Sequence, residues 1–376
     1  MSGHSRFQRW FLPGFAFKAV VIGGGYATGR ELAEFFLPSG PLGGVLGMLL
    51  AMVVWSAIAA ITFVYARQVA AYDYGAFFRN LLGPVAFVFD LAFVALLLIV
   101  LSVFGAAAGE LGHAVLGWPK LAGTLALVFG IALFATFGDE SVEGLFKWVT
   151  YFLYLVYAIF VVLVVSQVSD RIVAAFAAPQ DPVGWVPGGL TYAAYNVFGA
   201  VAILPVLRHL TSRRDAVIAG LLCGPLGMLP ALLFFVCMTA WYPEIASAAL
   251  PSDHVLTRID APMFHVVFQL MIFAALLESG AGCVHGLNQR IAGVLAPRGI
   301  GLTTPTRAAI TAATLVIAVF FATKVGLVAL IAGGYRFLAW LFIVVYVIPV
   351  ATLGLWRITR GTDAASGSAT DPKPAP

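Results

Sequence analysis

A carboxylate and a hydroxyl stand side by side in the middle of an apolar segment, at Glu278 and Ser279. An ionisable side chain at that depth in a bilayer is costly and by default suggests a function. A buried carboxyl group can carry a proton, because burial disfavours its charged form. Ionised Glu278 together with Ser279 would instead offer the oxygen ligands that a hard cation such as Na⁺ prefers. The alternative is a structural carboxylate paired with an arginine or a backbone amide.

Helical spacing extends this site toward one end of the segment. Glu278, Gly282, His285 and Gln289 share one stripe of a helix, because they are three or four residues apart. His285 would then lie between Glu278 and the membrane surface, where a proton relay needs it. We therefore assign ion or proton coupling to Glu278, Ser279, Gly282 and His285.

Three consecutive glycines interrupt another apolar segment, which runs from about Phe11 to Leu37. Glycine costs roughly 1 kcal/mol relative to alanine inside a helix. A helix that breaks within a membrane must line a cavity, because lipid cannot satisfy the freed backbone groups. Free amides at the break, and the positive end of the helix that follows, favour a carboxylate. The residues expected to contact a substrate here are Gly23, Gly24, Gly25, Tyr26, Ala27 and Thr28.

A second break is predicted near Asn196 and Gly199, with Pro205 further along the same segment. These residues are poor formers of a helix interior. Tyr195 and Phe198 flank the break, so Tyr195, Asn196, Phe198 and Gly199 are added to the substrate site. The two broken helices lie five spans apart and cross in opposite directions, which is typical of secondary transporters. The alternative is that the glycines only permit close helix packing.

Charged residues follow the first break. Arg30 and Glu34 stand four residues apart, so their side chains can pair on one helix face. Glu31 lies between them, and Arg336 begins the last predicted span. A mutually neutralised pair in a vestibule is one interpretation. The other is an outer gate in which Arg336 pairs with Glu31 or Glu34.

The composition predicts a polytopic membrane protein. The chain has 376 residues, of which 61% are hydrophobic and 10% charged, against about 25% charged in soluble domains. A net charge of +4 needs no nucleic acid to explain it, and the three cysteines lack metal-ligand spacing. Ten spans of about 20 apolar residues are expected. They are roughly Phe11–Leu37, Leu42–Tyr65, Pro84–Leu111, Leu121–Phe137, Val142–Ser166, Leu190–Val206, Ala216–Trp241, Met263–Gly286, Pro305–Ala322 and Arg336–Trp356.

Ten spans place both termini on one side. Most Lys and Arg residues of the loops fall on that side, so the positive-inside rule predicts cytoplasmic termini in the cell membrane, the inner membrane where there are two. We expect a cytoplasmic tail over residues 1–10, a transporter domain over 11–360 and a disordered cytoplasmic tail over 361–376. Inverted repeats are expected over about 11–166 and 188–356. We expect the stretch Val325–Gly334 to form a short interfacial helix or a re-entrant helix that leads into the last span.

The first motif resembles a known family. Gly-Gly-Gly-Tyr-Ala-Thr-Gly-Arg-Glu at 23–31, with Phe35-Phe36, is similar to the first-span signature of the YkvI-like membrane proteins, a branch of the amino acid/polyamine/organocation superfamily. Tyr195-Asn196 and Glu278-Ser279-Gly280 are also similar to it. Tyr26 and Arg30 depart from the family's pattern.

The resemblance implies a LeuT-type fold of five plus five inverted spans, with a central site between spans 1, 3, 6 and 8. It further implies an amino acid permease, and a Na⁺ site between spans 1 and 8, near Gly23, Gly24, Glu278 and Ser279.

These patterns together predict a secondary transporter that works by alternating access and is driven by Na⁺ or H⁺. Its partners would be the lipid bilayer and a small, carboxylate-bearing solute, with no cofactor besides the coupling ion and no nucleic acid. A channel or a transporter-derived sensor is the alternative. An enzyme is not expected, because the spans carry none of the hydrolase or metalloprotease motifs.

Overall fold

The computed structural model describes residues 5–137, 139–179, 181–295, 301 and 303–360, and within them the chain is helical and forms no strand. Seven helical stretches are long and apolar enough to cross a membrane. The shorter apolar helix Lys120–Phe134 and two interrupted helices bring the spans in this part of the chain to ten, as the sequence predicts.

The uninterrupted spans keep most of their backbone hydrogen bonds within one helix, as lipid requires. They are α4 (Gly40–Gln68), α6 (Phe87–Leu116), α7 (Lys120–Phe137), α8 (Asp139–Ala177, kinked at Val168), α11 (Arg213–Met238), α13 (Pro262–Leu295) and α14 (Thr304–Val325). The last span consists of α15 (Leu327–Ala329), η8 (Leu330–Tyr335), α16 (Arg336–Phe342), η9 (Ile343–Val347) and η10 (Val350–Gly354).

The last span begins earlier than predicted. The stretch Val325–Gly334, expected to lead into the last span as an interfacial or re-entrant helix, continues through η8 directly into α16. Arg336 therefore lies several residues inside this span rather than at its start. Gly333 and Gly334 do not end the helix, because η8 continues through them with a wider helical turn.

The first and sixth spans are the interrupted ones, as predicted. The first consists of α1 (Leu12–Val21), α2 (Gly24–Ala27) and α3 (Arg30–Phe35), and the sixth of α9 (Trp185–Asn196), α10 (Gly199–Ala202) and η4 (Leu204–His209). The remaining short helices are η1 (Phe7–Phe11), η2 (Leu37–Ser39), α5 (Tyr74–Leu82), η3 (Gly83–Ala86), η5 (Thr239–Trp241), η6 (Glu244–Ser247) and α12 (Pro251–Leu256).

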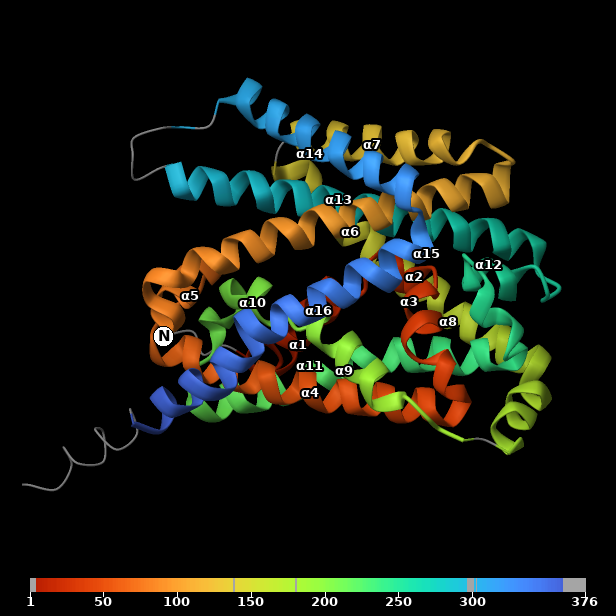
Figure 1. Ribbon diagram of the computed structural model, residues 1–376, viewed down its shortest axis with the longest axis horizontal. Coiled ribbons are helices and arrows are strands. Elements are labelled where there is room, and N and C mark those ends of the chain that lie inside the picture. The colour runs from red at the N-terminus through yellow and green to blue at the C-terminus, as the bar shows by residue number, and fades with distance from the viewer. Residues whose placement is uncertain (1–4, 138, 180, 296–300, 302, 361–376) are drawn as a thin grey trace, which may run out of the picture.

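The spans pack in two groups of four. In the lower part of Figure 1, α11 contacts both α1 and α4, and α4 contacts α9. Above them, α6, α7, α13 and α14 all contact one another. Each group combines two spans of the first half of the chain with the corresponding two of the second half. This is the arrangement expected of two repeats of five spans, and the interrupted spans α1–α3 and α9–η4 lie within the first group.

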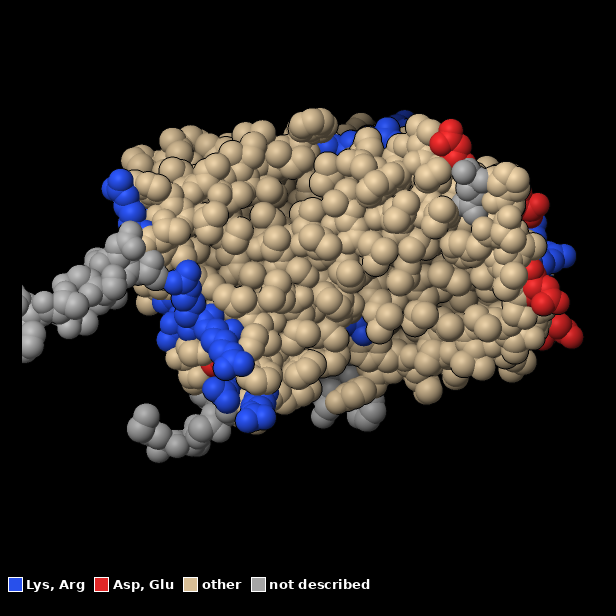
Figure 2. All heavy atoms as spheres, turned by 90° about the horizontal axis from the view of Figure 1, so that it is seen from below, with Lys and Arg blue, Asp and Glu red and all other residues tan. Residues whose placement is uncertain are grey.

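The surface agrees with a membrane environment. Large apolar side chains such as Phe129, Met263 and Trp340 are exposed along the spans, where lipid rather than water would cover them. Both ends of the described chain lie at one end of the bundle (Figure 1). Figure 2 shows that Lys and Arg on the face in view gather mainly at that end, while Asp and Glu gather at the opposite end. We refer to these as the basic and the acidic end of the molecule.

Candidate functional site

The first break has two parts. Helix α1 stops at Ile22, whose ψ of 74° is not helical, and Gly23 separates it from α2. A second turn follows at Gly29, which has φ +77°, a left-handed conformation that glycine adopts without strain. An ideal Cβ at Gly29 would lie 2.8 Å from Phe234 Cε1 and 3.2 Å from Pro251 Cβ. Gly29 therefore sets the direction of α3, which carries Arg30, Glu31 and Glu34.

The two breaks lie next to each other. Helix α1 packs against α10, and α3 packs against α9. The part of the first span before its break therefore meets the part of the sixth span after its break, and the other two parts also meet. Gly199 permits the first contact, because an added Cβ would lie 3.0 Å from the Phe17 ring. At the second break the side-chain amide of Asn196 donates to the backbone carbonyl of Tyr192 at 3.1 Å. Phe198 lies below it in an aromatic cluster with Phe93, their ring centroids 5.6 Å apart.

Spans 3 and 8 complete the surroundings of the first break. A Cβ at Gly23 would lie 3.3 Å from the Phe104 ring of α6 and 4.0 Å from Ser279 Oγ of α13. The structure thus brings Gly23 and Ser279 together, as the predicted ion site requires. Glu278, Gly282 and His285 lie on the same helix and are partly exposed, and Glu278 and His285 both take part in further interactions.

Lys18 was not singled out from the sequence. It lies on α1 and is 9% exposed, and its Nζ stands 3.7 Å from the centroid of the Tyr154 ring of α8. The hydroxyl of Tyr154 is within electrostatic range of Glu278. A cation from span 1 and a carboxylate from span 8 therefore flank one tyrosine of span 5. A lysine amid apolar residues of a span is the signal that would have found it.

Glu31 lies in a different environment from its neighbours. Its carboxylate is buried and accepts a 2.6 Å hydrogen bond from the hydroxyl of Tyr195. Tyrosine rings surround it: Tyr195 and Tyr335 lie 4.5 Å apart, and Tyr192 and Tyr195 5.6 Å apart, between ring centroids. No basic side chain of the described residues lies within ion-pair distance of Glu31, since Arg30 and Arg336 pair with Glu34 instead.

Two ion pairs lie on the side of the first break that is toward the acidic end of the molecule. Glu34 accepts from Arg30 at 2.9 Å and from Arg336 of α16 at 3.1 Å. Arg30 also donates to the carbonyls of Ala246 and Ala248 at 2.8 and 2.9 Å, in the connection between spans 7 and 8. Of the two partners considered for Arg336, the structure selects Glu34 rather than Glu31.

Ion pairs also join the spans at the basic end. Arg290 of α13 binds Asp90 of α6 through two nitrogens at 2.7 to 3.0 Å. Near the N-terminus, Trp10 donates to Asp215 of α11 at 2.7 Å, and Arg9 lies 3.4 Å from the same carboxylate. The breaks are thus enclosed by polar bridges on both sides.

The remaining predicted residues are placed as follows. The amide of Ala27 already donates to the carbonyl of Gly23 at 3.1 Å, so it is not one of the free donors expected there. The amide of Arg30 donates to the hydroxyl of Thr28 at 3.3 Å. The surroundings of Gly24 and Gly25 lie outside the described part. Among the described residues, no group of three His, Cys, Asp or Glu side chains could hold a metal ion.

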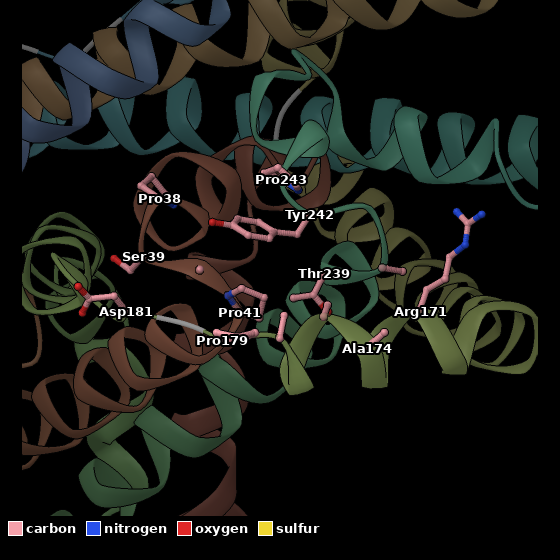
Figure 3. A pocket seen from close by; sticks show the side chains of 14 residues that line it. Pro38, Ser39, Pro41, Arg171, Ala174, Pro179, Asp181, Thr239, Tyr242 and Pro243 are labelled. Atoms are coloured by element: carbon pink, nitrogen blue, oxygen red, sulfur yellow. The ribbon is translucent and has the colours of Figure 1, made fainter.

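Two cavities lie away from the breaks. One of about 590 Å³ opens at the acidic end between η2, the end of α8 and η5. Figure 3 shows Ser39, Asp181 and Tyr242 on its wall. The other, of about 330 Å³, surrounds the Asp90–Arg290 pair. Neither is lined by the residues at the two breaks, so the predicted substrate residues do not form either of them.

Ten spans in two repeats, with the first and sixth interrupted beside each other, define a LeuT-type membrane fold. Solved structures agree. The chain matches MhsT in complex with L-phenylalanine with a TM-score of 0.58 and 15% identity, over 90% of this chain and 88% of that one. It matches a mutant form of the Eremococcus coleocola manganese transporter with a TM-score of 0.54 and 14% identity, over 93% of this chain and 80% of that one.

A similarity in sequence points to a particular relative. The chain is 25% identical to the uncharacterized membrane protein YkvI of Bacillus subtilis (strain 168) over 279 residues, which are 74% of this chain and 79% of that protein. This confirms the resemblance seen in the first motif. No family model matches the chain.

Proposed function

We propose that this protein is a secondary transporter that moves a small organic solute by alternating access. The observation that carries the proposal is the meeting of two interrupted helices, one from each repeat, at the same place in the bundle. Backbone that leaves the helix at this depth needs a polar occupant, and transporters of this architecture use it for the solute. The bridges Arg336–Glu34 and Arg290–Asp90 lie at opposite ends, where two gates would open in turn.

The solute that suits the first break carries a carboxylate, such as an amino acid. A carboxylate would accept from backbone amides at the start of α2, other than that of Ala27, which donates to Gly23. MhsT, which shares the fold, was solved with L-phenylalanine, and this supports an amino acid. Tyr195, Asn196 and Phe198 supply the opposite wall from span 6.

Glu278 is proposed as the coupling residue, with H⁺ as the ion. The Nζ of Lys18 stands over the ring of Tyr154, whose hydroxyl is within electrostatic range of Glu278. A protonated Lys18 there would make the binding of a second cation less favourable, whereas a proton can move between a carboxylate and a neighbouring base. Ser279 and the carbonyls of span 1 would hold Na⁺ in the alternative.

The proposed orientation places the basic end, with both termini, in the cytoplasm. The gathering of Lys and Arg there supports it through the positive-inside rule. The Arg336–Glu34 bridge would then be the outer gate, and the N-terminal Trp10 contact would belong to the cytoplasmic side.

Reconstituted protein tests the proposal. Proteoliposomes are given a mixture of radiolabelled amino acids under an imposed pH gradient or an imposed Na⁺ gradient. Wild type is expected to accumulate label with the pH gradient alone. Glu278→Gln should abolish accumulation while its elution profile and unfolding temperature stay near wild type.

Glu110→Gln is the matched control. Glu110 pairs with Lys120 at 2.5 Å at the far end of span 3, so the same loss of charge there should leave uptake unchanged. Uptake by Glu278→Gln with unchanged ion dependence would refute the coupling role. Conductance of many ions without saturation would refute the transporter proposal in favour of a channel.

A further inference from the structure

Three buried tyrosine hydroxyls near Glu31 have no hydrogen-bond partner among the described residues. They belong to Tyr26 on α2, Tyr157 on α8 and Tyr192 on α9, and all three side chains are at most 5% exposed. A buried hydroxyl without a partner costs about 1–3 kcal/mol. Each of them lies within electrostatic range of the Glu31 carboxylate. Unpartnered hydroxyls from three spans thus lie within range of one buried carboxylate.

Glu31 itself has an incomplete environment. An ionised carboxylate in a membrane interior needs a cation or several hydrogen bonds, and here it has the single donor Tyr195. On its own helix, Arg30 and Glu34 bind each other. Arg336 of α16 also binds Glu34, and η6 offers only Glu244, which binds Arg258 at 2.8 Å. The group that balances Glu31 is therefore either a proton or a cation that arrives from outside the protein.

The walls around Glu31 suit an organic cation. The rings of Tyr192, Tyr195 and Tyr335 pack together within electrostatic range of the carboxylate, and Tyr26 and Tyr157 lie 6.3 Å apart between ring centroids. Aromatic faces attract ammonium groups most strongly where water is excluded. The free hydroxyl oxygens can also accept from an N–H donor. A divalent metal such as Ca²⁺ would instead need about six to eight oxygen ligands.

We infer that Glu31 is an exchange site, which holds a proton in the empty transporter and the protonated amine of the solute in the loaded one. The inference rests on the proposed transport function and specifies its substrate class as primary amines, amino acids included. The exchange balances: Glu31–COOH and R–NH₃⁺ give the ion pair Glu31–COO⁻ with R–NH₃⁺, and one proton leaves to the side that is open.

Matched ligands show whether the protein recognises the amine or the carboxylate of the solute. The probes are L-phenylalanine, 2-phenylethylamine and 3-phenylpropanoate, with L-leucine, 3-methylbutylamine and 4-methylpentanoate as a second series. Binding to purified protein is measured by calorimetry in two buffers of different ionisation enthalpy, which counts the protons released. Wild type is expected to bind the amino acid and the amine of at least one series, and to release about one proton per ligand at acidic pH. In that range the apparent affinity should weaken about tenfold for each unit by which the pH falls, because binding releases a proton.

Glu31→Gln should weaken amine binding by about 100-fold or more, because one partner of a buried ion pair is lost, and should abolish proton release. Glutamine can still accept from Tyr195, so the fold is expected to persist. Tyr195→Phe is the second variant: it keeps the carboxylate, so it should retain proton release with an affinity weakened by roughly tenfold. Glu110→Gln again serves as the matched control and should behave as wild type.

Amine binding that is undiminished in Glu31→Gln, or that releases no proton in wild type, would overturn the inference. So would a wild type that binds the two carboxylic acids but neither amine, and in that case the proposed transport of a carboxylate-bearing solute would still stand. If no probe of either series binds, the inference is wrong and the proposed substrate class is wrong with it.

Discussion

Gly29→Ala tests whether the turn between α2 and α3 is fixed by the left-handed backbone of Gly29. At φ +77° a residue with a Cβ is strained by roughly 1–2 kcal/mol. The added methyl would also lie 2.8 Å from Phe234 Cε1, a distance that forces a shift. Phe234 is buried and packs edge-on against Phe160 with ring centroids 5.1 Å apart, so it has little room to move. Overpacking of this kind costs about 1–3 kcal/mol.

The two terms predict a loss of roughly 2–5 kcal/mol for Gly29→Ala. Thermal unfolding of the purified protein in detergent measures it as a fall of several degrees. Gly293→Ala is the matched control, since Gly293 lies in α13 with nothing within 4 Å of its Cβ position. There the substitution should be neutral or stabilising by up to about 1 kcal/mol, because alanine forms helix better than glycine.

Two further variants separate strain from crowding. Gly29→Asn tolerates the left-handed conformation but keeps the clash, and Gly29→Ala with Phe234→Leu relieves the clash but keeps the strain. Each is expected to lie between wild type and Gly29→Ala. Equal stability of Gly29→Ala and Gly293→Ala would refute the reasoning that this turn is locked by Gly29 and that it directs α3.

Two more outcomes follow from the acidic end of the molecule. Glu34→Gln removes the negative charge that Arg30 and Arg336 share and so weakens the bridge. Thr28→Cys, in a background without native cysteines, should then react about tenfold faster with a membrane-impermeant maleimide, the equivalent of about 1.4 kcal/mol; an unchanged rate would show that the bridge does not close this end. Burial, and then a neighbouring arginine, lower the pKa of His254 below its usual range. The unfolded chain therefore binds more protons there, so stability should fall as the pH drops below about 6.5, and His254→Gln should show a smaller fall between pH 7 and 5 in thermal unfolding; an identical profile would contradict this assignment.

The spans and the two breaks could be predicted because they depend on local chemistry. Apolar runs of about 20 residues span a bilayer whatever they pack against. Gly23–Gly25 and Asn196 disfavour a helix wherever they stand, so the interruptions are visible in the sequence itself. Boundaries were less certain where glycines occur inside a helix. Gly333 and Gly334 do not end one, because η8 continues through them.

The positions of side chains around the site could not be predicted in the same way. Spacing of four residues indicates that Arg30 and Glu34 can pair, and the structure confirms that contact at 2.9 Å. Spacing says nothing about which neighbouring span each face of α3 meets. That depends on the left-handed turn at Gly29, which rotates Glu31 toward Tyr195 and leaves Glu34 to Arg336. Glu31 and Glu34 are chemically identical and three residues apart, yet Glu31 binds a tyrosine and Glu34 binds two arginines.

This division bears on the order of events in transport. Glu31 is buried behind the Arg336–Glu34 bridge, so a proton or an amine can reach it from the acidic end only when that bridge opens. Glu278 and Ser279, on the other side of the first break, keep partial exposure while the bridge is closed. Under the proposed mechanism a cation bound at Glu31 is released toward the acidic end only after the Arg336–Glu34 bridge opens.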